Sequence, residues 1–158
     1  MIIHLNNLRN YKFNSLYNYL LGVFIFISSC VAPPEYSDGL MNNLPAIVNE
    51  IDYFSLSVFG EDFNDSLIWD LELNLSENDI LLSTLIVKDL NVLSSELSTL
   101  VMTVASGDTI FNANIVNDII FTSEDSISVI GTPSSISINA QNFTGRLEYQ
   151  LIKNPVSG

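Results

Sequence analysis

Cysteine, histidine and basic residues are scarce in this sequence. Its 158 residues include one Cys, one His and five Lys and Arg. A single cysteine excludes an internal disulfide bond. Because residues 31–158 contain neither Cys nor His, that part of the chain cannot supply Ser–His–Asp or Cys–His catalysis. It also cannot supply a zinc site built on these ligands, a His-carboxylate iron site, or haem ligation through them.

Charge is unevenly distributed along the chain. Arg9 and Lys12 lie in the first 29 residues, where there is no acid, and all 18 Asp and Glu lie at Glu35 or later. From residue 30 onward, three cations and 18 acids give a net charge of −15. A surface with this charge repels nucleic-acid phosphates and anionic lipid head groups. We therefore expect no nucleic-acid partner, and attachment to a membrane would require an apolar group.

The first 30 residues have the three parts of a secretory signal. Residues 1–14 are polar and basic, residues 16–27 are rich in apolar side chains, and two small residues, Ser28 and Ser29, precede Cys30. A basic start, an apolar centre of about 7–15 residues and a small-residue cleavage site are typical of an exported chain. We therefore predict a signal helix within residues 1–29.

The cleavage region resembles the lipobox of bacterial lipoproteins. That family has an aliphatic residue three positions before a cysteine and small residues in between, and Ile27, Ser28, Ser29 and Cys30 fit this pattern. The family more often has Leu at the first of these positions and Gly or Ala just before the cysteine. The resemblance covers residues 1–30 and implies cleavage between Ser29 and Cys30. It also implies a diacylglyceryl thioether on Cys30 and acylation of the new amino group.

Three other interpretations of this segment remain open. An ordinary signal peptide could be cut after Ala32, although Pro33 would then follow the scissile bond, which signal peptidases tolerate poorly. A retained transmembrane anchor needs about 20 predominantly apolar residues, and the uninterrupted apolar run covers only residues 20–27. A eukaryotic secreted or membrane protein could carry glycans on Asn-x-Ser/Thr sequons. The chain has three of these, at Asn64, Asn74 and Asn142.

We expect the chain to divide into four segments. These are a signal peptide (1–29), a lipidated cysteine and tether (30–46), one β-domain (47–153) and a C-terminal tail (154–158). Three prolines in the tether discourage regular structure. A spacer of this kind would let a folded domain stand away from a bilayer.

Strand patterns dominate the segment after the tether. The clearest alternation of apolar and polar residues covers 66–75, with Ile68 as its one exception. Further alternating, aromatic or β-branched runs cover 53–59, 109–115, 118–122, 126–129, 135–139 and 146–151. Turn signals occur at 60–62, 76–79, 106–108, 123–125, 131–133 and 144–145. Many short strands with such turns predict an all-β fold, an antiparallel sandwich or barrel. Of these we expect an antiparallel β-sandwich of the immunoglobulin-like type without its disulfide.

One segment, 80–104, fits two kinds of structure. Leucines at 90, 93, 97 and 100 recur at helical spacing, and Asp89 could cap a helix there. We predict strands at 80–87 and 98–104, and the pattern leaves residues 90–101 open between helix and strand.

Carboxylates are the remaining candidates for catalysis. On one strand, Asp70 and Glu72 would point to the same face about 7 Å apart, within the range of an inverting glycosidase pair. An amphipathic strand exposing its acids to water explains the same pattern, and we favour it, so we predict no catalytic residue and no enzyme. Lys88 with a nearby Ser could imitate a Ser–Lys dyad. No phosphate-binding motif of the G-x-x-x-x-G-K or G-x-G-x-x-G type is present.

An acidic segment offers hard oxygen ligands. Asp62, Asn64 and Asp65, followed by Ser66, are the candidate ligands for Ca²⁺. The EF-hand pattern fails, because its sixth position is not Gly and Leu73 stands at its twelfth. We expect no cofactor, with Ca²⁺ as the alternative.

Aromatic side chains could form a glycan-binding face. Trp69 lies on the apolar side of its predicted strand, so we expect it in the core. Phe63 lies in a predicted acidic loop and is the better candidate for an exposed aromatic side chain.

These features together predict a lipid-anchored extracytoplasmic module that binds or assembles with a partner in a bacterial cell envelope. The expected partners are the bilayer, through acylated Cys30, and an envelope protein or a glycan. Val31 favours the outer membrane, because retention in the inner membrane of enteric bacteria usually uses Asp after the cysteine. The alternatives are a hydrolase that uses carboxylates alone and a structural subunit that contributes a strand or an edge to an envelope complex.

Overall fold

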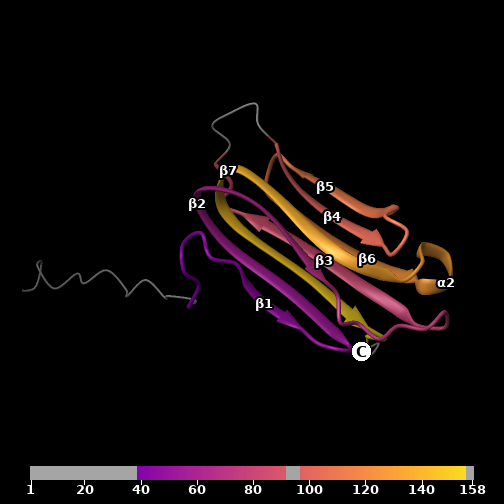
Figure 1. Ribbon diagram of the computed structural model, residues 1–158. Coiled ribbons are helices and arrows are strands. Elements are labelled where there is room, and N and C mark those ends of the chain that lie inside the picture. The colour runs from indigo at the N-terminus through magenta and orange to yellow at the C-terminus, as the bar shows by residue number, and fades with distance from the viewer. Residues whose placement is uncertain (1–38, 92–96, 156–158) are drawn as a thin grey trace, which may run out of the picture. The chain divides into compact units, whose positions relative to one another are not determined.

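The computed structural model of the chain describes residues 39–91 and 97–155 (Figure 1). These residues belong to one compact unit, Asp38–Gly158. The elements in chain order are β1 (Ala46–Asn49), β2 (Tyr53–Asp70), β3 (Ile80–Lys88), β4 (Ser98–Val104), β5 (Thr109–Ile115), β6 (Ile119–Ser126), α2 (Ile127–Ile130) and β7 (Pro133–Lys153). The predicted signal segment and Cys30 lie outside the described residues.

The described fold is all-β, as predicted, and every pairing between named strands is antiparallel. The strands predicted at 53–59, 80–87, 98–104 and 109–115 are all present. Of the open segment 90–101, residues 98–101 belong to β4 and residues 92–96 lie outside the described part. No helix among the described residues is long and apolar enough to cross a membrane.

Two long strands, β2 and β7, organise the domain. The first part of β2 pairs with the last part of β7, and this first half of the sheet continues to β1 on one side and to β3 and β6 on the other. The second half contains the rest of β2 and β7, together with β4 and β5. Both long strands therefore pass from one half of the sheet into the other.

The strands change direction at a pair of compensating β-bulges. The partners are Gly60 with Gly145, then Phe63 with Phe143, then Asp65 with Ala140. An extra residue thus occurs first in β2 and then in β7, so the original register returns after both. Asp62 and Asn142 supply the left-handed backbone conformations, with φ of 51° and 49°. Bulges bend a strand and increase its twist, which explains the change of direction here.

Gly60 is required at this bend because another residue occupies the space beside it. A Cβ atom at position 60 would lie 2.4 Å from Cδ1 and 2.6 Å from the carbonyl oxygen of Phe143.

The turns predicted at 60–62 and 144–145 are wrong, because both segments lie inside continuous strands. Phe63 is also buried, at 5% exposed, instead of lying in a surface loop. We call the end of the domain that contains residues 60–65 of β2 and 140–145 of β7 the bend end.

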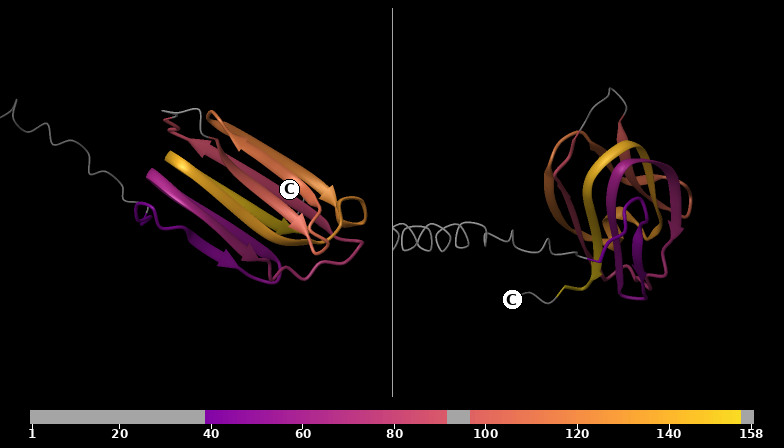
Figure 2. Two further views of the ribbon diagram at one scale, coloured as in Figure 1. Left: turned by 45° about the horizontal axis from the view of Figure 1, so that its top comes forward. Right: turned by 90° about the vertical axis from the view of Figure 1, so that its left-hand side faces the viewer.

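The two halves of the sheet lie over each other (Figure 2). They share one hydrophobic core. Tyr149, in the first half, is fully buried and stacks on Phe111 of the second half with ring centres 5.5 Å apart. Its hydroxyl group also contacts the sulfur of Met102, at 3.9 Å. Inward-facing side chains alternate with half-exposed ones along β2, β3 and the later part of β7, which explains the period-two patterns in the sequence.

Three local predictions differ from the structure. The turn predicted at 123–125 is part of β6, and the strand predicted at 126–129 is replaced there by the short helix α2. The strand predicted at 66–75 ends at Asp70, although Leu73 is buried. The alternation in 71–75 thus reflects burial rather than pairing. Its ladder stops because β7 begins at Pro133, which has no N–H to donate.

Asp79 joins several chain segments at the end opposite the bend. Its carboxylate accepts hydrogen bonds from the Ser76 backbone N–H and from the Asn154 side chain, at 2.6 and 2.7 Å. It also forms an ion pair with Lys153, at 3.2 Å. These donors, the Asn154 side chain first, lower the pKa of Asp79 far below its usual range. We call Ser76, Asp79, Lys153 and Asn154 the Asp79 cluster.

Candidate functional site

Strand β6 has a free edge. Within the described part of the chain it pairs only with β3, from Ile119 to Ser126. Ile120 is 78% exposed on the outer face of the first half of the sheet, and Phe121 is 37% exposed on the opposite side of the strand. Apolar side chains on a strand edge that lacks a partner are unusual in proteins that remain monomeric, because the edge can pair with another chain.

A column of aromatic rings leads from this edge into the core. The ring centre of Phe121 lies 5.5 Å from that of Phe111, which in turn stacks on Tyr149. β5 and β6 pair with different strands, so no described strand pairing closes the seam between them. The ring of Phe121 is thus packed against the ring of Phe111 on the core side of β6.

Polar groups accompany the aromatic column. Ser123 donates a hydrogen bond of 2.9 Å to the carboxylate of Asp125, and both residues are half-buried. Burial raises the pKa of Tyr149 well above its usual value, and Asp125 raises it further against the opposing effect of a hydrogen bond with Ser83. Tyr149 is therefore a neutral phenol at physiological pH. The seam combines apolar rings with one carboxylate and neutral hydroxyl groups.

This arrangement is suited to binding an extended peptide segment. Every second residue of an edge strand directs its N–H and C=O groups away from its partner, so a segment of another chain can pair with them. Along β6 such a segment would meet apolar side chains at Ile120 and Phe121, and then acidic ones at Glu124 and Asp125. The complementary segment is apolar at one end and basic at the other.

The candidate Ca²⁺ ligands lie in the bulge of β2, where their oxygens are used within the protein. Asn64 donates from its side chain to the side-chain oxygen of Asn142 and accepts from the Asn142 backbone N–H, both at 2.8 Å. The Asp65 carboxylate accepts from the backbone N–H of Ser66 at 2.8 Å, and the Asp62 carboxylate accepts from the Thr144 hydroxyl at 3.4 Å. No group of three or more His, Cys, Asp or Glu suited to a metal ion occurs among the described residues.

The proposed glycosidase pair does not have the geometry that the sequence suggested. Asp70 is the last residue of β2, and Glu72 lies beyond the strand. The side chain of Asn49 joins their backbones, because it donates to the Asp70 carbonyl at 2.8 Å and accepts from the Glu72 N–H at 3.0 Å. Both carboxylates are exposed. Lys88, the lysine of the hypothetical dyad, is also exposed, at the end of β3.

The aromatic candidates lie mainly in the interior. Phe63 is buried, and Trp69 is half-buried and packs against the core, as expected for its position on the strand. Ile120 was not among the site residues expected from the sequence, and Phe121 was considered only as one of several aromatic residues available for a glycan-binding face. The available signal was the apolar run 119–121, which two hydroxyl residues separate from Glu124 and Asp125, but a buried strand gives the same signal.

Comparison with known proteins gives no family for this chain. No protein-family model, no curated protein and no solved structure matches it.

Proposed function

We propose that this chain is a bacterial lipoprotein whose β-domain binds a partner of the cell envelope. The proposal for its location rests on the lipobox-like segment 27–30, which would leave Cys30 acylated at the new N-terminus. A body with a net charge of −15 has no electrostatic route to an anionic bilayer, so acyl chains would hold it. Two or more chains make such attachment stable. Val31 favours the outer membrane.

The β-domain itself is best described as a β-sandwich formed by one bent sheet. Supporting this are the shared core and the passage of β2 and β7 through both halves. Its proposed activity is the binding of an extended segment of an envelope protein along the free edge of β6. The observation that carries this proposal is the exposure of Ile120 on a strand that, among residues 39–91 and 97–155, pairs on one side only.

The anchor is tested by labelling with radioactive palmitate in bacterial cells. Cys30→Ala is expected to abolish labelling, because it removes the thiol that forms the thioether. Ser29→Ala is the matched control and should keep its label, since small residues fit that position of the lipobox. Undiminished labelling of Cys30→Ala would show that the lipid is elsewhere and would refute the anchor.

Partner binding is tested by site-specific photo-crosslinking in the native envelope. A photoreactive residue at Thr122, exposed on β6, is expected to give one adduct of defined mass. The same residue at Glu148, which is exposed on β7 between β2 and β3, is the control and should give none. Ile120→Lys should weaken the Thr122 adduct, because a charged side chain on an edge opposes strand addition. Equal adducts at both positions, or none at position 122, would contradict the assignment of β6.

A further inference from the structure

Two of the three basic residues that follow residue 30 are neighbours on adjacent strands. Lys88 of β3 is the antiparallel partner of Arg146 of β7, on the outer face of the first half of the sheet. The guanidinium carbon of Arg146 lies 5.1 Å from the centre of the Phe59 ring of β2. Like charges placed opposite each other on a sheet are destabilising. The pair places two positive charges side by side on this face.

This basic pair lies at the bend end, where the first described residues join the domain. Asn42 forms a bridge with Phe59, and the N–H of Asn43 donates to the Phe59 carbonyl at 2.8 Å. Met41 and Leu44, on either side of this contact, are both exposed apolar side chains. Cations and apolar side chains thus occur together at one end of the domain.

The covalent chain limits how far this end can lie from an anchor. Cys30 precedes Gly39 by nine residues, and nine residues span at most about 30 Å when fully extended. If Cys30 carries the lipid, the bend end is the part of the domain that is tied to the bilayer surface.

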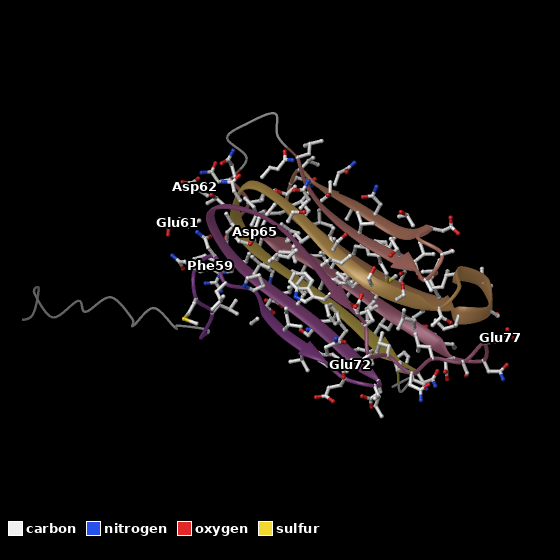
Figure 3. All side chains as sticks on the ribbon, viewed as in Figure 1. Phe59, Glu61, Asp62, Asp65, Glu72 and Glu77 are labelled. Atoms are coloured by element: carbon white, nitrogen blue, oxygen red, sulfur yellow. The ribbon has the colours of Figure 1, made fainter. Side chains whose placement is uncertain are left out.

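Acidic side chains at the same end decide which kind of bilayer fits. Glu61 and Asp62 are exposed beside Phe59, while Glu72 and Glu77 lie at the other end (Figure 3). A purely anionic surface would be repelled by Glu61 and Asp62 and by the net charge of the domain. A zwitterionic phospholipid offers a phosphate to the basic pair and an ammonium group to the carboxylates.

We propose that the bend end docks on a zwitterionic phospholipid surface. Met41 and Leu44 enter the boundary between head groups and acyl chains, and Lys88 and Arg146 contact lipid phosphates. This inference rests on the proposed lipid anchor and adds a fixed orientation to it. The opposite end, with the β1–β2 turn at Ile51, then points away from the membrane.

The test measures tryptophan quenching by lipids that carry bromine near the head group. Full-length lipidated protein in a Trp69→Phe background is reconstituted in phosphatidylethanolamine–phosphatidylcholine vesicles. Met41→Trp and Ile51→Trp are a matched pair, because these side chains are 63% and 65% exposed at opposite ends of one segment. Loss of fluorescence is expected at position 41 and not at position 51. Leu44→Trp is the second reporter should Met41→Trp disturb the fold.

Three outcomes would overturn the inference. Equal quenching at positions 41 and 51 would show that the domain has no preferred orientation. Unchanged quenching in Lys88→Gln would show that phosphate contacts do not contribute, and stronger quenching on phosphatidylglycerol vesicles would contradict a zwitterionic partner. Failure of the anchor gives a different result, because the protein would then not sediment with any of these vesicles.

Discussion

The two ends of the domain are held together by different physical means. At the bend end, Gly60 has no side chain, so the buried ring of Phe143 can pack directly against its backbone. The strands continue there from one half of the sheet to the other. At the opposite end, the Asp79 cluster joins the start of β3 to the end of β7 through hydrogen bonds and an ion pair. Packing is insensitive to pH, whereas a carboxylate cluster is not. The stability of one end of the domain thus depends mainly on packing, and that of the other end depends on the charge of Asp79.

The largest effect that would test this comparison is expected from the bend. Phe143→Ala should lower the free energy of unfolding by about 3–5 kcal/mol, since it deletes a buried ring. Gly60→Ala should lower it by about 1–3 kcal/mol, because the added Cβ overlaps Phe143. In the double variant the overlap with the ring is gone and only the overlap with the backbone carbonyl oxygen of residue 143 remains, so the loss should be smaller than the sum of the two. Urea denaturation of the four proteins measures this cycle.

The control for the bend is Ser57→Ala, a change on the half-exposed outer face of the same strand, which should leave the urea midpoint nearly unchanged. Strict additivity of Gly60→Ala and Phe143→Ala would contradict the contact between them, because residues without a shared contact add independently.

A smaller effect is expected from Asp79→Asn. The lowered pKa of Asp79 means that its charged form stabilises the fold fully above the ordinary aspartate pKa of about 3.9. This contribution is lost as pH falls toward the lower pKa of the folded state. The urea midpoint of Asp79→Asn should therefore lie below that of the unchanged protein at pH 7, and the gap should narrow between about pH 4 and pH 2.

Comparing each variant with the unchanged protein at the same pH removes the general effect of titrating the other acids. The gap for Gly60→Ala should stay constant over that range, because neither Gly60 nor Phe143 titrates. A constant gap for Asp79→Asn, or one that widens in acid, would mean that Asp79 is not the pH-dependent element of its cluster.

The sequence was sufficient to predict the strands whose side chains alternate between core and surface. The alternating runs 135–139 and 146–151, which both lie within β7, were found in this way, and the all-β class was predicted correctly as well. It was insufficient at the bend. Glycines such as Gly60 and Gly145 usually indicate turns, but glycine is also used at a bulge inside a long strand. Only the partner strand shows that the ladder continues, and pairing partners are distant in sequence.

The candidate site was missed for a related reason. Ile120 and Phe121 resemble residues of a buried strand, yet both are exposed and β6 lies at the end of the strand order. Strand order is a property of the whole fold, so no local pattern could reveal it. The acids at 62–65 were noticed because of their composition, yet the bend uses the Asn64 amide to bind Asn142.

The two bulges are linked, because the extra residue in one strand is matched by an extra residue in the other. Each adds one residue to one strand, and the second cancels the shift made by the first. Deleting Asp62 alone would remove the first bulge and leave the extra residue of β7 uncompensated, so the original register would not return after Asp65. Deleting a residue near Asn142 as well would restore the match. Natural variants of this domain should therefore gain or lose residues at these two places together, although 80 positions separate Asp62 from Asn142.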